Sequence, residues 1–420
     1  TAVAENISAA SWMKDSRRLV VVRKETMTKW KELAAVLPAD RQAEIAKLAE
    51  SLRQQLMANK GDLGQFQPTV PPENFGDLAM ILMYLRDEAA GNLPETLGEN
   101  WKPIEELKID LCRLTTCPAV ASAPMGKPLA VALTCLEPQA SPDGKAIAYH
   151  GSMIDRAMAE NGLVVVPTDG SGPPRVVAQR TAAWAGWSPD GRHLAYASAN
   201  LPKSRDGDTL RLGTISRSEI IDDTGRMPPS DMPFPREDLA GILFHEEAKV
   251  TCLPDGRILF SSVELDLPAT TADMPQQMSL FCVNPKQPTV TRLLPRQAQA
   301  QLVEPLMYFS VSPNGKSAAI LGNKGQVSVV SLETGKARTI VESQPNGPNS
   351  LAVPVWRSDT ELTFIAPPNS HFNDTGRPEV VTVELTGQGP PTARCLSKDW
   401  SQEVRLGILE QPKPETQPAK

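Results

Sequence analysis

Short apolar runs separated by tight polar turns recur along most of the chain. Residues 186–196 read GWSPDGRHLAY, in which the turn Ser188-Pro189-Asp190-Gly191 separates one apolar run from the next. Proline fixes φ at the second turn position, aspartate can bond to its own backbone, and glycine tolerates a positive φ. The pattern therefore predicts a β-hairpin.

The same turn pattern occurs six times along the chain. With its Asp or Asn as the marker, the copies lie at Asp15, Asp143, Asp190, Asp255, Asn314 and Asp359. After a first gap of 128 residues, the spacings are 47, 65, 59 and 45 residues. A period of about 45 residues with insertions indicates a β-propeller of four-stranded blades. In the fifth copy, apolar alternation predicts strands at 306–311, 316–321, 326–332 and 337–341. We expect Asp143, Asp190, Asp255 and Asn314 to be structural turn residues and not ligands.

The run Trp187-Ser188-Pro189-Asp190-Gly191, followed by a short apolar strand, resembles the hallmark of the TolB-like family of propeller repeats. The resemblance covers about residues 8–24 and 105–400. It implies a mainly β fold, a six-bladed β-propeller over residues 1–410. Such repeats occur in TolB itself, in the propellers of prolyl-oligopeptidase-type peptidases and in some polysaccharide lyases, so the motif indicates a fold more than a function. Residues 411–420 are a proline-rich tail that we expect to be disordered.

Residues 25–105 interrupt the first blade with a pattern typical of α-helices. Ile45, Leu48, Leu52 and Leu56 share one helical face, and further helices are predicted at 27–37 and 75–90. Two interpretations of this helical insertion stay open: a cap packed on the propeller, or a docking module for another protein. In a docking module, the anchors are methionine and aromatic side chains, which are enriched in interface cores: Met80, Met83, Tyr84 and Trp101.

Connections of unequal length are expected to give the propeller one plain and one decorated face. With the strands of a blade named a to d in chain order, the a–b and c–d turns are short and share a face. The long segments, at 25–105, 199–208, 216–248, 265–277 and 367–377, belong to the other face. Loops on a rigid scaffold carry functional sites, so we expect function on the decorated face. The favoured interpretation is a non-catalytic scaffold or accessory subunit that binds another protein there.

The alternative is an exported hydrolase or lyase with a metal or catalytic site at the channel mouth. Three of the four histidines, His150, His245 and His371, fall on segments of the decorated face. Imidazole nitrogens transfer protons and bind metals. However, no pair of histidines has a metal-ligand spacing, and no G-x-S-x-G nucleophile motif occurs. The sequence therefore predicts neither a metal nor another cofactor, and it weighs against an enzyme.

Charge and composition limit the classes of partner and the cellular locations that the sequence favours. A net charge of −6 and a pI near 5.5, without a basic cluster, argue against nucleic acid. No apolar run reaches the length of a membrane span. The chain begins at Thr1, as it would after removal of a signal peptide or N-terminal anchor, and with the resemblance this favours an exported, periplasmic protein of a bacterium. Six cysteines leave their pairing open.

Overall fold

The computed structural model describes most of the chain in two compact units, Thr1–Arg292 and Leu293–Lys420, and each is described by itself. The described residues are 7–58, 77–120, 126–158, 160–201, 211–246, 248–263, 278–293, 308–321, 326–341, 354–366, 379–386 and 392–395. His371 and the proline-rich tail at 411–420 lie outside them.

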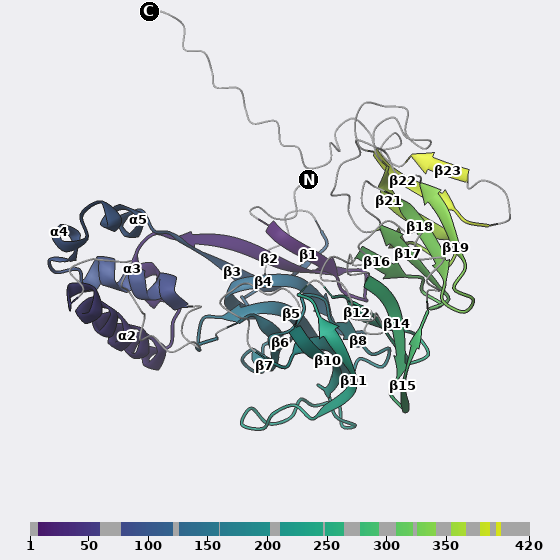
Figure 1. Ribbon diagram of the computed structural model, residues 1–420, viewed down its shortest axis with the longest axis horizontal. Coiled ribbons are helices and arrows are strands. Elements are labelled where there is room, and N and C mark those ends of the chain that lie inside the picture. Colours follow the sequence, from purple (N-terminus) through teal and green to yellow (C-terminus); the bar gives the residue numbers. More distant parts are fainter. Residues whose placement is uncertain are drawn as a thin grey trace, which may run out of the picture. The chain divides into compact units, whose positions relative to one another are not determined.

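The first unit begins with a seven-stranded antiparallel sheet in which each strand pairs with the next along the chain (Figure 1). Its strands are β1 (Ile7–Trp12), β2 (Arg18–Met27), β3 (Ile109–Pro118), β4 (Ala130–Ala140), β5 (Ala146–Met153), β6 (Gly162–Pro167) and β7 (Arg175–Gln179). The first residues of β4 pair with β3, and after two register shifts its remaining residues pair with β5 only. All of β5 and all but the last residue of β6 are buried, so the strands have no polar face, and β6 reads as a continuous apolar run.

A second antiparallel sheet of eight strands completes the first unit. Its strands are β8 (Gly186–Trp187), β9 (His193–Ala199), β10 (Arg211–Glu219), β11 (Arg236–Phe244), β12 (Val250–Cys252), β13 (Ile258–Val263), β14 (Met278–Asn284) and β15 (Gln287–Arg292). β11 and β13 meet at a single register pair, Leu243 with Val263, and β12 pairs with β13 beside them.

The strands β10 and β11 correct the expectation that residues 216–248 form one long connection. β10 carries buried polar side chains and β11 begins with three exposed charged residues, so neither strand shows a clear apolar alternation. The buried Ser216 hydroxyl donates to Asp238 across the pair at 2.7 Å. The true connection, residues 220–235, lies at the turn end of β9, where the Ile220 N–H donates to the Arg192 carbonyl at 2.7 Å. The end expected to carry only short turns therefore carries a long connection too.

The second unit contains two antiparallel four-stranded sheets. One consists of β16 (Tyr308–Val311), β17 (Ser317–Leu321), β18 (Val327–Ser331) and β19 (Ala337–Val341), and the other of β20 (Val355–Trp356), β21 (Glu361–Ala366), β22 (Glu379–Glu384) and β23 (Thr392–Cys395). The four strands predicted between residues 306 and 341 match β16 to β19 within two residues at each end. A shared apolar core that includes Leu321, Val327 and Phe364 joins the two sheets.

The marker residues close their turns as predicted. In each turn the N–H two residues further on donates to the marker's side-chain oxygen, at 3.1 Å for Asp143, 3.0 Å for Asp190, 3.0 Å for Asp255 and 2.9 Å for Asn314. The glycine after each marker has a φ between 70° and 85°, which other residues adopt only with strain. Each of these four residues therefore closes its turn through its own side chain, and their assignment as structural residues and not ligands stays a prediction.

Helices fill the chain between β2 and β3, which pair directly with each other (Figure 1). They are α1 (Trp30–Ala34), α2 (Ala39–Ala58), α3 (Leu78–Glu88), α4 (Leu93–Leu97), the 3-10 helix η3 (Gly98–Trp101) and α5 (Lys102–Glu105). The apolar face predicted for α2 is buried at Ile45, Leu52 and Leu56. Ile109 and Leu111 of β3, with Ile154 after β5, belong to the same core. The helices therefore cover their apolar faces within the chain.

This core corrects the expectation that Met80, Met83, Tyr84 and Trp101 anchor another protein. Met80 and Met83 are 0 % exposed and Trp101 is 7 % exposed. Tyr84 is half-buried, with its ring edge-on to Trp30 at a centroid distance of 5.0 Å. These side chains are used inside the helical core and do not form an exposed contact surface.

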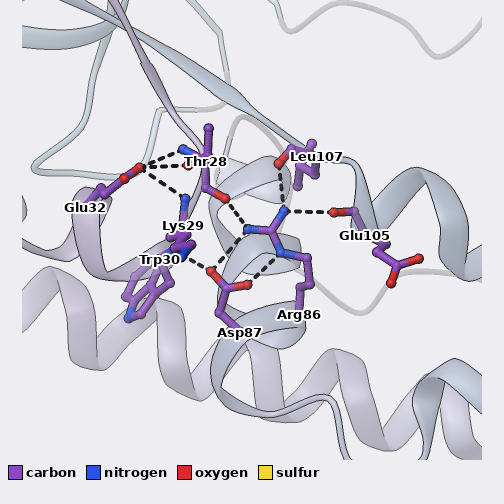
Figure 2. A network of polar contacts seen from close by, with 8 residues as sticks. All are labelled: Thr28, Lys29, Trp30, Glu32, Arg86, Asp87, Glu105 and Leu107. Carbon is purple, nitrogen blue, oxygen red and sulfur yellow. Dashed lines mark hydrogen bonds and ion pairs between the residues drawn. The ribbon is translucent and has the colours of Figure 1, made fainter.

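A polar network joins the helices to the ends of β2 and β3 (Figure 2). Figure 2 shows the Arg86 guanidinium between the two chain segments, donating to the Thr28 carbonyl at 2.6 Å and to the Leu107 carbonyl at 2.7 Å. Asp87 pairs with Arg86 and accepts the Trp30 N–H at 2.6 Å. The carboxylate thus satisfies a backbone donor at the start of α1 that has no partner within the helix.

The remaining predictions on membrane and cysteines concern the described residues only. None of the helices described combines the length and apolar character needed to cross a bilayer. Cys112, Cys117, Cys135 and Cys282 are buried free thiols, and Cys252 is a half-buried one. No disulfide therefore forms among these five.

Asp190→Ala is expected to lower the free energy of unfolding by about 0.5–2 kcal/mol, by analogy with a lost helix cap. The Ser188 hydroxyl and the Arg192 N–H both lose their acceptor in this variant. Urea denaturation followed by tryptophan fluorescence measures the change. Glu88→Ala removes an exposed carboxylate and serves as the control, with an expected change below about 0.5 kcal/mol. Equal stability of the two variants would show that Asp190 does not hold its turn.

Asp77→Asn is expected to cost more, about 3 kcal/mol, the lower end of the cost of breaking a buried pair, because it removes the buried counter-charge of Arg41 and leaves only the partly exposed Glu44 carboxylate. Arg41 of α2 pairs with Asp77, and the two side chains are 1 % and 2 % exposed. The matched control is Glu50→Gln, which breaks the solvent-exposed pair with Arg53 and is expected to cost less than about 1 kcal/mol. The same denaturation experiment tests both, and a cost for Asp77→Asn as small as that of the control contradicts the prediction.

Candidate functional site

A small polar cavity lies where strands of the first and second sheets end, away from the marker turns. Its volume is 180 Å³, and it is lined by His150, Glu160, Asn161, Arg180, Thr181, Arg211 and Glu246. His150 lies on β5 and Arg211 begins β10, while the other five lie in segments beside β6, β7 and β11. We call it the His150 cavity. At about 30 Å³ for each water molecule, it has room for several waters or a small polar group.

His150 presents a neutral imidazole to this cavity. The residue is 8 % exposed, and its Nε2 lies 3.0 Å from the Thr181 carbonyl oxygen. A carbonyl only accepts, so Nε2 carries the proton and Nδ1 carries the lone pair. Within the described part of the chain, Nδ1 has no hydrogen-bond partner. Burial lowers the pKa of His150, although the Thr181 carbonyl and Glu246 act in the opposite direction. The imidazole is therefore an unprotonated base at neutral pH.

Two arginines and two glutamates surround the imidazole. Glu160 lies 2.9 Å from Nη1 of Arg211 and 3.4 Å from Nε of Arg180. Glu246 lies 3.7 Å from Nη2 of Arg211. Arg211 is buried, and its guanidinium also stacks over the Phe244 ring at 5.2 Å. The opposite charges compensate each other, which offsets the cost of removing them from water.

Arg180 is the less constrained of the two arginines. Its side chain is 34 % exposed, and in the described part of the chain its guanidinium contacts Glu160 only. Its backbone has a φ of 56°, a left-handed conformation that is uncommon for a residue with a side chain. Hydrogen bonds from the Arg180 N–H to Asn161 and from the Ala199 N–H to the Arg180 carbonyl maintain that conformation. Strain of this kind clusters at functional sites.

The cavity contains a second buried polar atom that has no partner among the described residues, the Thr181 hydroxyl oxygen. Thr181 is 4 % exposed and follows Arg180 directly. Buried polar atoms normally have partners, because an unpaired one costs about 1–3 kcal/mol. Two such atoms beside one cavity indicate a place for water or for a polar ligand.

The structure describes two of the three histidines predicted from the sequence, and only one of them lines the cavity. His150 lines the cavity, whereas His245 is next to a lining residue, Glu246, without lining the cavity itself. His371 lies outside the described residues. In the described ranges, no three His, Cys, Asp or Glu side chains are grouped closely enough to bind a metal ion. Sequence reasoning missed Glu160, Arg180 and Arg211 altogether.

A lysine with an altered pKa was also missed. Lys249 comes immediately before β12, and its backbone forms a parallel bridge with Trp184. Burial lowers the pKa of Lys249 to about 8, against the opposing effect of Glu137. Its amine therefore changes protonation close to neutral pH.

Comparisons with known proteins give a fold likeness only. No protein-family model and no curated protein matches the sequence. Among solved structures, a puromycin-hydrolyzing peptidase of Mycobacterium tuberculosis is 17 % identical over 68 % of this chain and 42 % of its own, with a TM-score of 0.44. A putative TolB from Agrobacterium tumefaciens is 20 % identical over 55 % of this chain and 75 % of its own, with a TM-score of 0.33. The β-propeller domain of the Trilobed protease from Pyrococcus furiosus is 10 % identical over 68 % and 77 %, with a TM-score of 0.42.

The similar structures include β-propeller proteins. This chain spans less than half the length of the puromycin-hydrolyzing peptidase. Two of the three structures bear the names of peptidases, so propellers of this kind occur in enzymes. The expectation of a non-catalytic scaffold, which rested on the long loops and helices of the decorated face, is corrected on this ground.

The free energy of unfolding is expected to fall as the pH drops below the ordinary histidine pKa of 6.5. Below that pH the unfolded chain binds a proton at His150, while the buried imidazole stays neutral until the pH reaches its lower folded-state pKa. His150→Gln retains a donor for the Thr181 carbonyl and does not titrate. Urea denaturation of both proteins between about pH 7.5 and pH 5 measures the difference. Stability curves of the two proteins that stay parallel over this range would contradict the prediction.

Proposed function

We propose that the chain is a six-bladed propeller of hydrolytic function, with the helices inserted in its first blade. The strand pairing supports six units of four strands. The first unit consists of β1, β2, β3 and the start of β4, and the second of the rest of β4 with β5, β6 and β7. The units β8–β11, β12–β15, β16–β19 and β20–β23 follow. The helices belong between the second and third strands of the first unit.

The proposed reaction site is the His150 cavity, and the neutral imidazole carries the proposal. His150 is buried, and its Nδ1 has no hydrogen-bond partner among the described residues. The residue lines a space of 180 Å³ that is also lined by Arg180 and Arg211. A structural core histidine usually has both nitrogens satisfied. Here Nε2 is fixed by the Thr181 carbonyl, and we assign the proton transfer to Nδ1, a buried atom without a partner among the described residues.

In the proposed reaction, Nδ1 of His150 takes a proton from a water molecule as the oxygen of that water attacks the substrate. The Thr181 carbonyl accepts from Nε2–H, so it holds the ring orientation and stabilises the imidazolium that forms. Arg180 is placed to bind the negative charge that develops on the attacked group, because its guanidinium reaches the cavity and is only weakly held by Glu160. The leaving group receives a proton from the imidazolium, which restores the neutral ring.

Glu160 and Arg211 act as positioning residues in this scheme. The carboxylate of Glu160 contacts both guanidiniums, at 2.9 Å and 3.4 Å. It therefore keeps Arg180 beside the imidazole, while Arg211 compensates its charge. Pre-arranged charges of this kind stabilise a transition state without the cost of reorganisation.

His150→Gln is expected to lower kcat by about a hundred- to ten-thousand-fold, the usual contribution of a general base. The purified full chain is assayed against puromycin, aminoacyl p-nitroanilides and p-nitrophenyl esters. His193→Gln is the matched control, because His193 is half-buried beside the marker turn, at the other end of the strands. Thermal unfolding of each variant checks folding. Hydrolysis of no substrate by the wild-type chain, or equal kcat in His150→Gln and the control, contradicts the proposal.

A further inference from the structure

A second hollow lies at the opposite end of the strands from the His150 cavity. Its volume is 590 Å³, within the usual range of ligand sites. Three segments form it: the marker turn before β5, the turn between β6 and β7, and residues 220–235. Its charged lining residues are Lys145, Asp169, Arg175 and Arg226. We call it the cationic groove.

The wall formed by residues 220–235 is a pre-arranged turn. The Asp222 carboxylate accepts the N–H groups of Thr224 at 2.9 Å and Arg226 at 3.0 Å, and the Asp222 N–H donates to the Arg226 carbonyl at 2.9 Å. Gly225 has a φ of 80°, and a Cβ at that position would come within 2.8 Å of the Lys145 Nζ. The turn therefore places the Lys145 amine beside the residue that precedes Arg226.

Arg175 fixes the same wall to the first sheet. Its guanidinium donates to the carbonyl oxygens of Pro228 and Met232 and stacks over the Phe234 ring at 4.1 Å. The donors of Arg175 are thus used within the protein. Binding at this groove would need little rearrangement, which lowers the entropic cost of association.

Two cations of the groove remain available to a ligand. Lys145 is 57 % exposed, and its ion pair with Asp143 is long, at 3.8 Å. Arg226 is exposed, and its guanidinium acts on the nearby Asp222 carboxylate through charge, without a hydrogen bond or ion pair in the part of the chain that the structure describes. The acidic residue of the groove, Asp169, accepts the Ser171 N–H at 2.9 Å. Among the lining residues three cations therefore stand against one carboxylate, on a chain whose net charge is −6. The carboxylates of Asp143, Asp222 and Asp231 act on these cations from outside the lining.

The shape and surroundings of the groove favour a peptide over a lone anion. Pro167, Pro173, Pro228 and Met227 give it apolar walls between the charges. Arg175 also begins β7, which is the last strand of its sheet and pairs only with β6 among the described strands. The outer edge of such a strand offers backbone N–H and C=O groups to an extended peptide.

We propose that the cationic groove binds an acidic peptide segment in an extended conformation, with its carboxylates on Lys145 and Arg226. The apolar walls contact the side chains between these carboxylates. The site is separate from the His150 cavity, and binding there requires no catalytic activity of the chain.

The test uses fluorescence polarisation with the full chain and a fluorescein-labelled hexapeptide of alternating Glu and Val, at a low ionic strength of about 0.05 M. The same peptide with Gln in place of Glu is the neutral probe. We expect the acidic probe to bind, the neutral probe to bind much more weakly, and K145Q/R226Q to weaken binding of the acidic probe by about tenfold. Added salt should weaken the wild-type interaction.

The matched control is K31Q/K47Q, which removes the same charge from exposed positions on the helices. It should bind the acidic probe as the wild-type chain does. Three results overturn the proposal: no binding of the acidic probe, equal binding by K145Q/R226Q and the control, or full displacement of the probe by equimolar inorganic phosphate, which would indicate a small-anion site. Thermal unfolding confirms that both double variants are folded.

Discussion

A buried hydrogen bond joins the first two sheets, from the indole of Trp187 to the carbonyl of Gln139 at 3.3 Å. Trp187 is only 9 % exposed, and it lies in an apolar cluster with residues from both sheets, including Val165 and Tyr196. An indole N–H buried in such a cluster needs an acceptor, so the bond fixes the ring at one depth between the sheets. Both the His150 cavity and the cationic groove lie along this junction, one at each end of the strands.

The same contact recurs at equivalent positions of the repeat. In the second unit, the Trp356 indole donates to the Ser310 carbonyl at 3.2 Å, and in the first unit the Cys252 thiol lies 3.4 Å from the Gly186 carbonyl. In each case the donor directly precedes a marker turn, and the acceptor lies on the strand before the previous marker turn. The turn motif therefore has two roles: it closes a hairpin through its Asp or Asn, and it places a donor that bonds to the strand of the previous hairpin.

Local features were predictable from the sequence, and features assembled from distant segments were not. The marker turns follow from residue types at fixed offsets, so the turns at Asp143, Asp190 and Asp255 could be predicted from the sequence. β10 and β11 were missed because buried Ser216 bonds to Asp238 across the pair, and a period-2 apolar pattern does not register such positions. In the His150 cavity only the histidine stood out, as a rare residue type. Arg180 and Glu160 belong to residue types that are common on protein surfaces, so neither stands out in the sequence. They become neighbours only because strand pairing brings their segments together.

The helical residues show a different limit, since a sequence pattern reveals an apolar face but not what covers it. Ile109 and Leu111 of β3 and Ile154 after β5 complete the helical core. In addition, Nε of Arg41 donates to the Ile154 carbonyl at 3.4 Å, only four residues beyond His150. Removing the helices would expose these apolar side chains and release the end of the strand that carries His150. The helical insertion therefore belongs to the support of the proposed reaction site, and its retention in the chain needs no docking partner to explain it.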